Sequence, residues 1–377
     1  MAARLTLASS TRDTRFRFGV LERGHEDSHL GARLDGEFEH SHVVLRGGLE
    51  GARLASLTDG AVPASENVAP GSPVVRLDRN RRSSEHLGGY TEIEWRASRG
   101  LALLGGVRLD QLPGEVDKRI DPRIAAAYSA GAWTLRVGGG RFSQGRWRTR
   151  YALPDRGSPA GVPLGAYHLV AGIQREGAPA LRAEAYTKRY EDYVQEDRVG
   201  TDAPVATVGR AAGLDVLIRP QVLGPLVGWL TYSYLHCEVK LKDGSLVPCR
   251  FDVTHTLTAV GKLAVEEWEL GLTGRYATGR PYTPIVGAES PEDGRFAAPL
   301  YGPVHSDRLP AYFRLDGRLS RLGRPRGGVA AIYVEGLNVL NRGNVWGYSY
   351  DADYRTPRPI LTFFGHRTLV IGIEAQF

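Results

Sequence analysis

The last nine residues, Leu369–Phe377 (LVIGIEAQF), carry the alternation of side chains that decides the fold. One set of alternate positions is apolar and consists of Leu369, Ile371, Ile373, Ala375 and Phe377. The intervening set is Val370, Gly372, Glu374 and Gln376. Successive side chains of a β-strand point to opposite faces, so a period of two predicts a strand with one apolar face.

The same period recurs along most of the chain. In Glu267–Tyr276 the apolar residues alternate with charged and small ones, and Tyr312–Ser320 repeats the pattern. No stretch of a dozen residues has the apolar stripe of an amphipathic helix. The pattern predicts about sixteen strands and therefore an all-β fold. Further strands are predicted at Phe16–Val20, Leu30–Glu39, Glu92–Arg96, Leu181–Tyr190 and Leu257–Val265.

The connections between these strands alternate between short and long. The short ones are predicted at His40–Ser41, Ser98–Arg99, Gly131, Glu176–Pro179, Arg219–Pro225, Glu266 and Gly323–Gly328. The long, polar ones are Arg53–Ser84, Gln111–Pro122, Gln144–Ala166, Glu191–Val208, Glu238–Phe251, Thr278–Pro310 and Asn341–His366. This alternation is typical of an antiparallel up-and-down meander with tight turns at one end and loops at the other.

Composition excludes several classes of protein. The 377 residues carry a net charge of +6 and are 42% hydrophobic, which argues against disorder. The mean hydropathy is −0.27 and no apolar run approaches ~18 residues, so no spanning helix is predicted. The glycines have no three-residue period, which excludes collagen. Basic residues are dispersed, with the densest cluster at Arg79–Arg82, so no nucleic-acid partner is predicted.

A transmembrane β-barrel explains both the alternating faces and the two classes of connection. Its apolar face meets lipid, its polar face meets the lumen, and short periplasmic turns lie opposite long outer loops. A soluble sandwich has alternating faces but no reason to sort its connections by length. Aromatic residues near strand ends are typical of interfacial girdles. They include Trp229, Tyr232, Tyr234, Tyr276 and Tyr282.

The barrel interpretation makes specific predictions. Trp268, Leu270 and Leu272 should face outer-membrane lipid, and Glu269 and Arg275 should face the lumen. A strand of this kind at the C-terminus is typical of outer-membrane barrels of the Gram-negative type, and its end lies on the periplasmic side. Counting back places three long connections outside the cell. These are Glu238–Phe251, Thr278–Pro310 and Asn341–His366.

Seven ordered segments give the chain a resemblance to the TonB-dependent outer-membrane receptors, specifically to the C-terminal part of their barrel. The likeness covers most of Asp121–Phe377 and is weaker before it. Each segment alone matches the family only loosely, but the order and spacing of the seven segments are specific to it. The segments are Asp121–Tyr128, Gly140–Gln144, Glu184–Tyr190, Phe251–Leu257, Thr278–Pro284, Leu309–Asp316 and Val334–Arg342.

The resemblance implies energised uptake of a scarce solute, such as an iron chelate, cobalamin or an oligosaccharide. It also implies a TonB-type energising protein that acts through a plug domain. Neither a plug nor a signal peptide is recognisable in the sequence. Family barrels have ~22 strands. We therefore expect residues 1–377 to be one receptor-like β-barrel domain that is incomplete.

Known catalytic and metal-binding motifs do not occur in the sequence. There is no phosphate-binding loop, no paired Cys-x-x-Cys and no nucleophile elbow. The pairs His40/His42 and His25/His29 supply too few ligands for a metal site. The sequence therefore predicts no enzyme and no catalytic, cofactor-binding or metal-binding residues, and it leaves the ligand-binding residues unknown. Two alternatives stay open: an outer-membrane barrel enzyme with a Ser-His-acid site at its rim, and a soluble β-rich binding or adhesion protein.

The two cysteines, Cys237 and Cys249, flank a polar connection that contains the turn signal Asp243-Gly244. Their spacing is compatible with a disulfide across the base of that loop in an oxidising compartment. It is also compatible with two reduced thiols.

Overall fold

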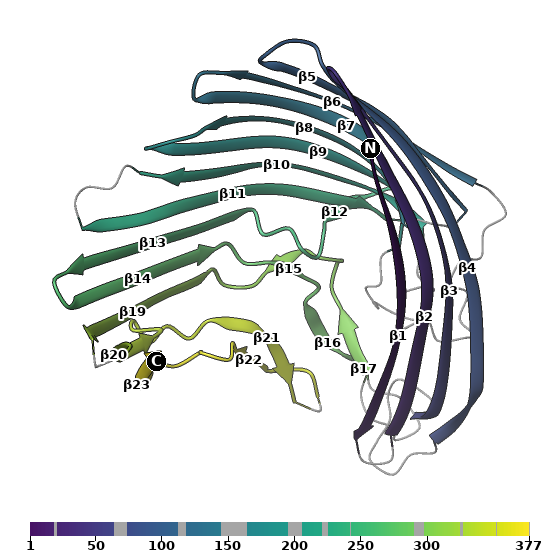
Figure 1. The fold of residues 1–377 in the computed structure, drawn as a ribbon. Helices are drawn as coiled ribbons and strands as arrows, with labels where there is room; N and C mark the ends of the chain where they lie inside the picture. The colour runs from purple at the N-terminus through teal and green to yellow at the C-terminus, as the bar shows by residue number, and fades with distance from the viewer. Residues whose placement is uncertain are drawn as a thin grey trace.

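The computed structural model describes residues 1–18, 21–63, 74–111, 118–144, 164–194, 206–220, 225–241, 243–289, 298–324, 327–351 and 353–376. Within these ranges the regular structure is β-strand (Figure 1). The main sheet has 17 strands, of which sixteen follow one another as an antiparallel meander and β12 pairs with the end of β11. The predicted all-β, up-and-down architecture is confirmed.

The strands of the meander differ in length. The first four are long: β1 is Ala2–Phe18, β2 is Leu21–His40, β3 is Val43–Pro63 and β4 is Val74–Arg96. The next seven are β5 Leu101–Gln111, β6 Lys118–Ala130, β7 Trp133–Gln144, β8 Leu164–Arg175, β9 Ala180–Val194, β10 Ala206–Arg219 and β11 Leu226–Lys240. The last five are β13 His255–Val265, β14 Trp268–Ala277, β19 Tyr312–Gly323, β20 Val329–Leu337 and β23 Thr368–Gln376.

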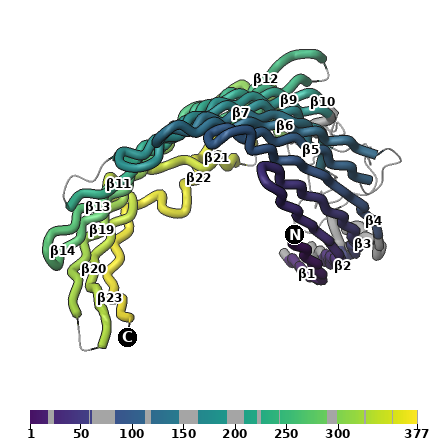
Figure 2. The backbone as a smooth tube through the Cα atoms, turned by 45° about the horizontal axis from the view of Figure 1, so that its top comes forward, coloured from purple at the N-terminus to yellow at the C-terminus, as the bar shows by residue number. Residues whose placement is uncertain are grey.

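The sheet is strongly curved and open. Among the described residues, β1 pairs with β2 and β23 pairs with β20, and no pairing joins β1 to β23. Figure 2 shows the two edge strands well apart at the opposite ends of an arch. The concave side of this arch is occupied by the short strands of the long connections (Figures 1 and 2). The fold is therefore part of a barrel wall with its loops folded inward.

The two faces of the sheet differ in chemistry, as predicted. Along β14, Trp268, Leu270 and Leu272 are 49%, 39% and 46% exposed, and Leu270 lies opposite Leu263 and Leu319 on the neighbouring strands. Glu269 lies on the other face, where its carboxylate is 2.5 Å from the Lys262 ammonium. A soluble β-protein would bury its apolar face, so exposure of this face argues against that alternative.

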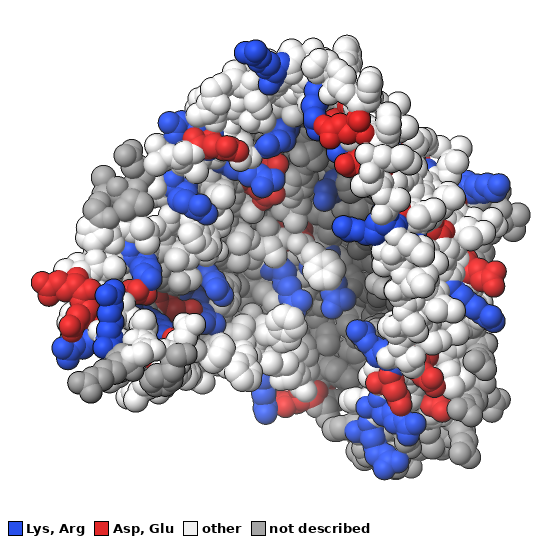
Figure 3. All heavy atoms as spheres, viewed as in Figure 1, with Lys and Arg blue, Asp and Glu red and all other residues white. Residues whose placement is uncertain are grey.

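The charged face lines the concave side. Arg314 lies on this face and stacks on Phe364, 4.9 Å from the ring centroid, in the connection that follows β22. That connection lies under the arch in Figure 2. Figure 3 looks into the hollow and shows Lys, Arg, Asp and Glu within it. The apolar face is therefore the convex side.

Aromatic side chains mark both ends of the apolar face. Trp268 lies at the tight-turn end of β14 and Tyr276 at the long-loop end, eight residues apart. At about 3.3 Å per residue and a strand tilt of ~40°, this separation corresponds to roughly 20 Å along the membrane normal, within the ~25 Å apolar band of outer-membrane barrels. Two residues predicted for the girdle lie elsewhere. Trp229 pairs with Val260 on the concave face, and Tyr282 belongs to an inner loop strand.

The tight turns coincide with the predicted short connections. Ser41, Gly131 and Glu266 have φ values of 53°, 58° and 52°, in the left-handed region that reverses the chain. One predicted long connection, Arg53–Ser84, is wrong in extent because β3 continues to Pro63 and β4 begins at Val74. Polar residues dominate residues 76–84, so apolar alternation gives no signal there, whereas backbone hydrogen bonds continue the ladder regardless of side chain.

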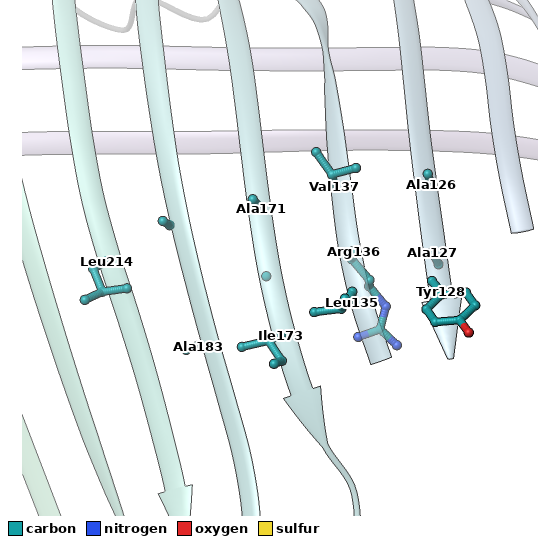
Figure 4. Close-up of a pocket in the computed structure, with 12 residues that line it drawn as sticks. Ala126, Ala127, Tyr128, Leu135, Arg136, Val137, Ala171, Ile173, Ala183 and Leu214 are labelled. Atoms are coloured by element: carbon teal, nitrogen blue, oxygen red, sulfur yellow. The ribbon is translucent and has the colours of Figure 1, made fainter. Parts of the chain in front are cut away.

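An apolar depression of about 560 Å³ lies on strands β6 to β10 (Figure 4). Small side chains such as Ala171 and Ala183 form part of it, and larger ones such as Leu135 and Ile173 stand beside them. Ile173 pairs with Leu135 on the apolar face of the sheet. The depression is therefore a shallow feature of the convex, apolar face of the wall.

Candidate functional site

Three long connections fold into short strands on the concave side, and one of them is fixed by the cysteines. β12 (Leu246–Pro248) pairs with the end of β11. Cys237 in β11 and Cys249 directly after β12 form a disulfide with a Cα–Cα distance of 5.3 Å. The Cys249 amide also donates to the Cys237 carbonyl oxygen at 2.9 Å. Together these bonds fix the position at which Arg250 leaves the loop.

The second connection begins where β14 ends. Arg280-Pro281-Tyr282 turns inward, and β15 (Pro281–Tyr282) pairs with β18 (Asp307–Arg308). Pro281 lacks a backbone donor, which is typical of a residue at which a long ladder stops. The backbone of Gly279 approaches Leu309 so closely that a Cβ there would lie 1.5 Å from its carbonyl oxygen. Glycine is therefore required at this crossing.

Two contacts hold the first and second connections together. The imidazole Nδ1 of His305 lies 2.6 Å from the Pro248 carbonyl oxygen. Arg308 donates to the Asp252 carbonyl oxygen at 2.8 Å and forms an ion pair with its carboxylate at 3.3 Å. Asp252 is only 2% exposed, whereas 38% of the Arg308 side chain is exposed, so the carboxylate of this ion pair is shielded from solvent and the guanidinium only in part. Arg250 and Arg280 are consequently held on the same structural unit.

The third connection supplies aromatic rings. β21 (Val345–Tyr350) pairs with β22 (Pro357–Leu361), and its sequence places Trp346, Tyr348 and Tyr350 at alternate positions. The guanidinium of Arg280 lies 4.3 Å from the Trp346 ring centroid and donates to the Trp346 carbonyl oxygen at 2.8 Å. The Tyr282 and Tyr348 rings are 5.6 Å apart. We call Arg250, Arg280, Tyr282, Trp346 and Tyr348 the mouth cluster.

Two side chains of the mouth cluster, Arg280 and Tyr282, have shifted pKa values. Partial burial and the nearby charge of Arg250 both lower the pKa of Arg280 below its usual value. Burial raises the pKa of Tyr282, and so does the Asp307 carboxylate, which accepts a hydrogen bond from the Tyr282 hydroxyl at 3.0 Å. Among the described residues, no carboxylate hydrogen bond or ion pair holds Arg280. The cluster therefore presents a cation without a protein counter-ion beside exposed aromatic faces.

A second polar group lies on the concave face of the wall. Glu50 in β3, His86 in β4 and Asp110 in β5 bring three potential metal-ligating atoms within 4.8 Å of one another. Arg108 donates to both Asp110 oxygens, at 2.6 and 2.7 Å, and to Glu50. The imidazole Nε2 of His86 lies 2.8 Å from Asp110. We call Glu50, His86, Arg108 and Asp110 the wall cluster.

The wall cluster already contains its own cation. The guanidinium of Arg108 bridges the two carboxylates that a metal ion would use. Gly88 makes room for this arrangement, because a Cβ there would lie 2.5 Å from Asp110 Oδ1 and 2.9 Å from Arg108 Nη2. The geometry fits an internal ion-pair network better than a metal site.

The residues weighed from sequence lie apart from both clusters. His40 ends β2 at a tight turn, whereas His25 lies within β2 rather than in the polar link predicted, with Nε2 2.9 Å from Asp27. Three other histidines contact a carboxylate, a tyrosine hydroxyl and a carbonyl oxygen. They are His86 with Asp110, His255 with Tyr232 and His305 with Pro248. These contacts give no support to a Ser-His-acid site.

Comparisons with solved structures find the same architecture in outer-membrane transporters. The unliganded ferric citrate transporter FecA superposes with a TM-score of 0.69 at 15% identity, covering 99% of this chain and 58% of that one. The chain has the barrel fold of the TonB-dependent receptors. The ferric yersiniabactin uptake receptor FyuA from Yersinia pestis gives 0.69 at 13% identity, with 99% and 58% covered. The ferripyoverdine receptor of the outer membrane of Pseudomonas aeruginosa gives 0.68 at 12%, with 99% and 53% covered.

The chain spans a little over half the length of these structures. Neither protein-family models nor curated proteins give a match to the sequence. No helix among the described residues is long and apolar enough to cross a membrane. At this level of identity the likeness establishes the fold and leaves the solute open.

Sequence reasoning missed both clusters. Arg280 enters the sequence analysis only inside Thr278–Pro284, a segment of the family resemblance, and not as part of a binding site. The alternation of Trp346, Tyr348 and Tyr350 inside a predicted loop was a usable signal, because period-two aromatics indicate a short strand with one aromatic face. The wall cluster has no such signal, since its members come from three strands, span 60 positions of sequence and meet through strand register.

Proposed function

We propose that this chain forms the wall and mouth of an outer-membrane receptor that captures a solute outside the cell and admits it to the lumen. The carrying observation is the combination of an exposed apolar convex face with a charged concave face and inward-folded loops. The convex face suits lipid contact, and the concave face suits water or a polar domain. The mouth cluster is the proposed site of capture.

Energised uptake belongs to this proposal through the fold. Solved neighbours of the same fold include a ferric citrate transporter and a copper transporter. A TonB-type energising protein acting through a plug domain is the partner that this fold implies. The neighbours are transporters and receptors, so a non-enzymatic role is the consistent one. In this proposal the mouth cluster, and not the wall, selects the class of solute, whether an iron chelate, cobalamin or an oligosaccharide.

Epitope accessibility on intact Gram-negative cells tests this proposal. One variant of the full chain carries the tag at Asp243-Gly244 in a mouth connection, and a matched variant carries it at Ser41-His42 in a tight turn. We expect antibody to label the first variant on intact cells and the second only after the outer membrane is permeabilised. Labelling in the opposite order, or recovery of both variants in the soluble fraction, would contradict the proposal.

A further inference from the structure

Two carboxylates, those of Asp252 and Asp307, lie where the first and second connections meet. Both are already engaged. Asp252 pairs with Arg308 at 3.3 Å, and Asp307 accepts the Tyr282 hydroxyl at 3.0 Å. Among the described residues, no carboxylate forms a hydrogen bond or ion pair with Arg280, whose partners are the ring and the carbonyl oxygen of Trp346.

Arg280 is held in a fixed orientation although no carboxylate among the described residues contacts it. Its guanidinium stacks over the Trp346 ring at 4.3 Å, and Nη2 donates to the Trp346 carbonyl oxygen. A guanidinium carries five N–H donors, so this single bond leaves donors for a ligand. A half-buried cation near a second cation is costly unless an anion completes it. Burial and Arg250 lower the pKa of Arg280, which is consistent with a missing counter-charge.

Aromatic faces adjoin this cation. Trp346 is 59% exposed, and the Tyr282 and Tyr348 rings stand 5.6 Å apart. Planar rings stack favourably on such faces, and guanidinium groups bind carboxylates with directed, charge-assisted hydrogen bonds. Figure 3 shows Lys and Arg side chains gathered in the middle of the hollow, where Figure 1 draws β15.

We propose that the mouth cluster selects an anionic solute that carries a planar ring, with its acidic oxygens on Arg280 and its ring against the exposed aromatic residues. The inference rests on the proposed function and narrows the class of solute. Neutral oligosaccharides are disfavoured by it, because they would leave the Arg280 charge without a partner. A carboxylate or a phenolate on an aromatic ring would provide one.

A matched pair of fluorescent probes tests the proposal. The probes are 7-diethylaminocoumarin-3-carboxylate and the corresponding 3-carboxamide, which share a ring and differ in charge. Binding to the full chain in liposomes is measured by anisotropy. We expect the carboxylate to bind about ten-fold or more tighter than the amide, the size of one charge-assisted hydrogen bond. The preference should shrink as ionic strength rises.

Variants separate the role of Arg280 from general effects. Arg280→Gln should abolish the preference for the carboxylate, and Arg280→Lys should keep part of it. Arg358→Gln is the matched control, because Arg358 is an exposed arginine of the third connection that pairs with Asp351 at 3.0 Å. It should leave both affinities unchanged. Limited proteolysis checks that each variant is folded, because strands of the folded sheet resist cleavage.

Equal affinities for the two probes, or an unchanged preference in Arg280→Gln, would overturn the proposal. That result would leave the receptor function standing if the tag at Asp243-Gly244 is still labelled on intact cells. Failure of that labelling would instead remove the proposed function itself. The two failures are therefore distinguishable.

Discussion

The wall cluster and the mouth cluster are both charged, yet they differ in how the charge is satisfied. Asp110 is 4% exposed, and both Arg108 and His86 contact its carboxylate. Around Arg280, the contacts are an aromatic ring and a carbonyl oxygen. The first arrangement is complete within the protein and stabilises the sheet. The second lacks an anion and is therefore suited to binding one.

The largest expected effect is a loss of stability when the wall cluster is broken. Asp110→Ala removes the carboxylate that holds Arg108 and His86, and it leaves a mostly buried guanidinium without its main partner. We expect a loss of about 3–4 kcal/mol in the free energy of unfolding, the lower part of the usual range for broken buried pairs. The loss is limited because 23% of the Arg108 side chain stays exposed.

Urea titration in bilayers measures this loss. Asp353→Ala is the control, because Asp353 is 59% exposed and should change stability by less than about 0.5 kcal/mol. A loss equal to that of the control would mean that the wall cluster is not structural.

The convex face of the wall gives the second effect. Leu270→Arg places a charge on the side that meets lipid, at a cost of about 2–4 kcal/mol near the midplane. Thr273→Arg is a comparison on the concave face of the same strand and should cost much less. Folding titrations of both variants in bilayers measure these two costs. Equal costs would contradict the assignment of the faces.

The disulfide provides the third contrast, since it belongs to the mouth alone. Reducing Cys237–Cys249 should destabilise the first mouth connection by roughly 3 kcal/mol on the chain-entropy estimate for a loop of this size. Hydrogen exchange should then rise around Leu246–Pro248 and stay unchanged in β3 to β5. Mass spectrometry of the purified chain shows whether the bond is present. Free thiols in protein from an oxidising compartment would contradict this part of the structure.

The smallest effect is a pH dependence in the mouth. The pKa of Tyr282 is raised by burial and by Asp307, so the folded state holds the phenol proton more tightly than the unfolded state. The resulting stability is present below the unfolded value of about 10 and is lost as pH rises above it. Tyr282→Phe should remove one late-titrating group from the tyrosinate absorbance at high pH. Loss of a group that titrates near the ordinary value of about 10, and not later, would show that Tyr282 is solvated.

Much of the wall was predictable from sequence, and most of the mouth was not. Alternation in segments such as Trp268–Ala277 reports directly on which face a side chain occupies, because strand geometry has a fixed period. The beginning of β4 lacks that signal, since polar residues dominate residues 76–84. The mouth depends on three connections meeting in space, and contacts such as His305 with Pro248 have no local signature.

One paired measurement tests the difference between wall and mouth most directly. Arg280→Gln and Arg108→Gln each remove one guanidinium, and the anisotropy of the coumarin carboxylate is recorded for both per folded molecule, with the unfolding free energy beside it. We predict that Arg280→Gln loses binding and keeps its stability, whereas Arg108→Gln keeps binding and loses stability. The reverse assignment, or equal losses of binding in both variants, would contradict the division between a self-contained wall and an anion-binding mouth.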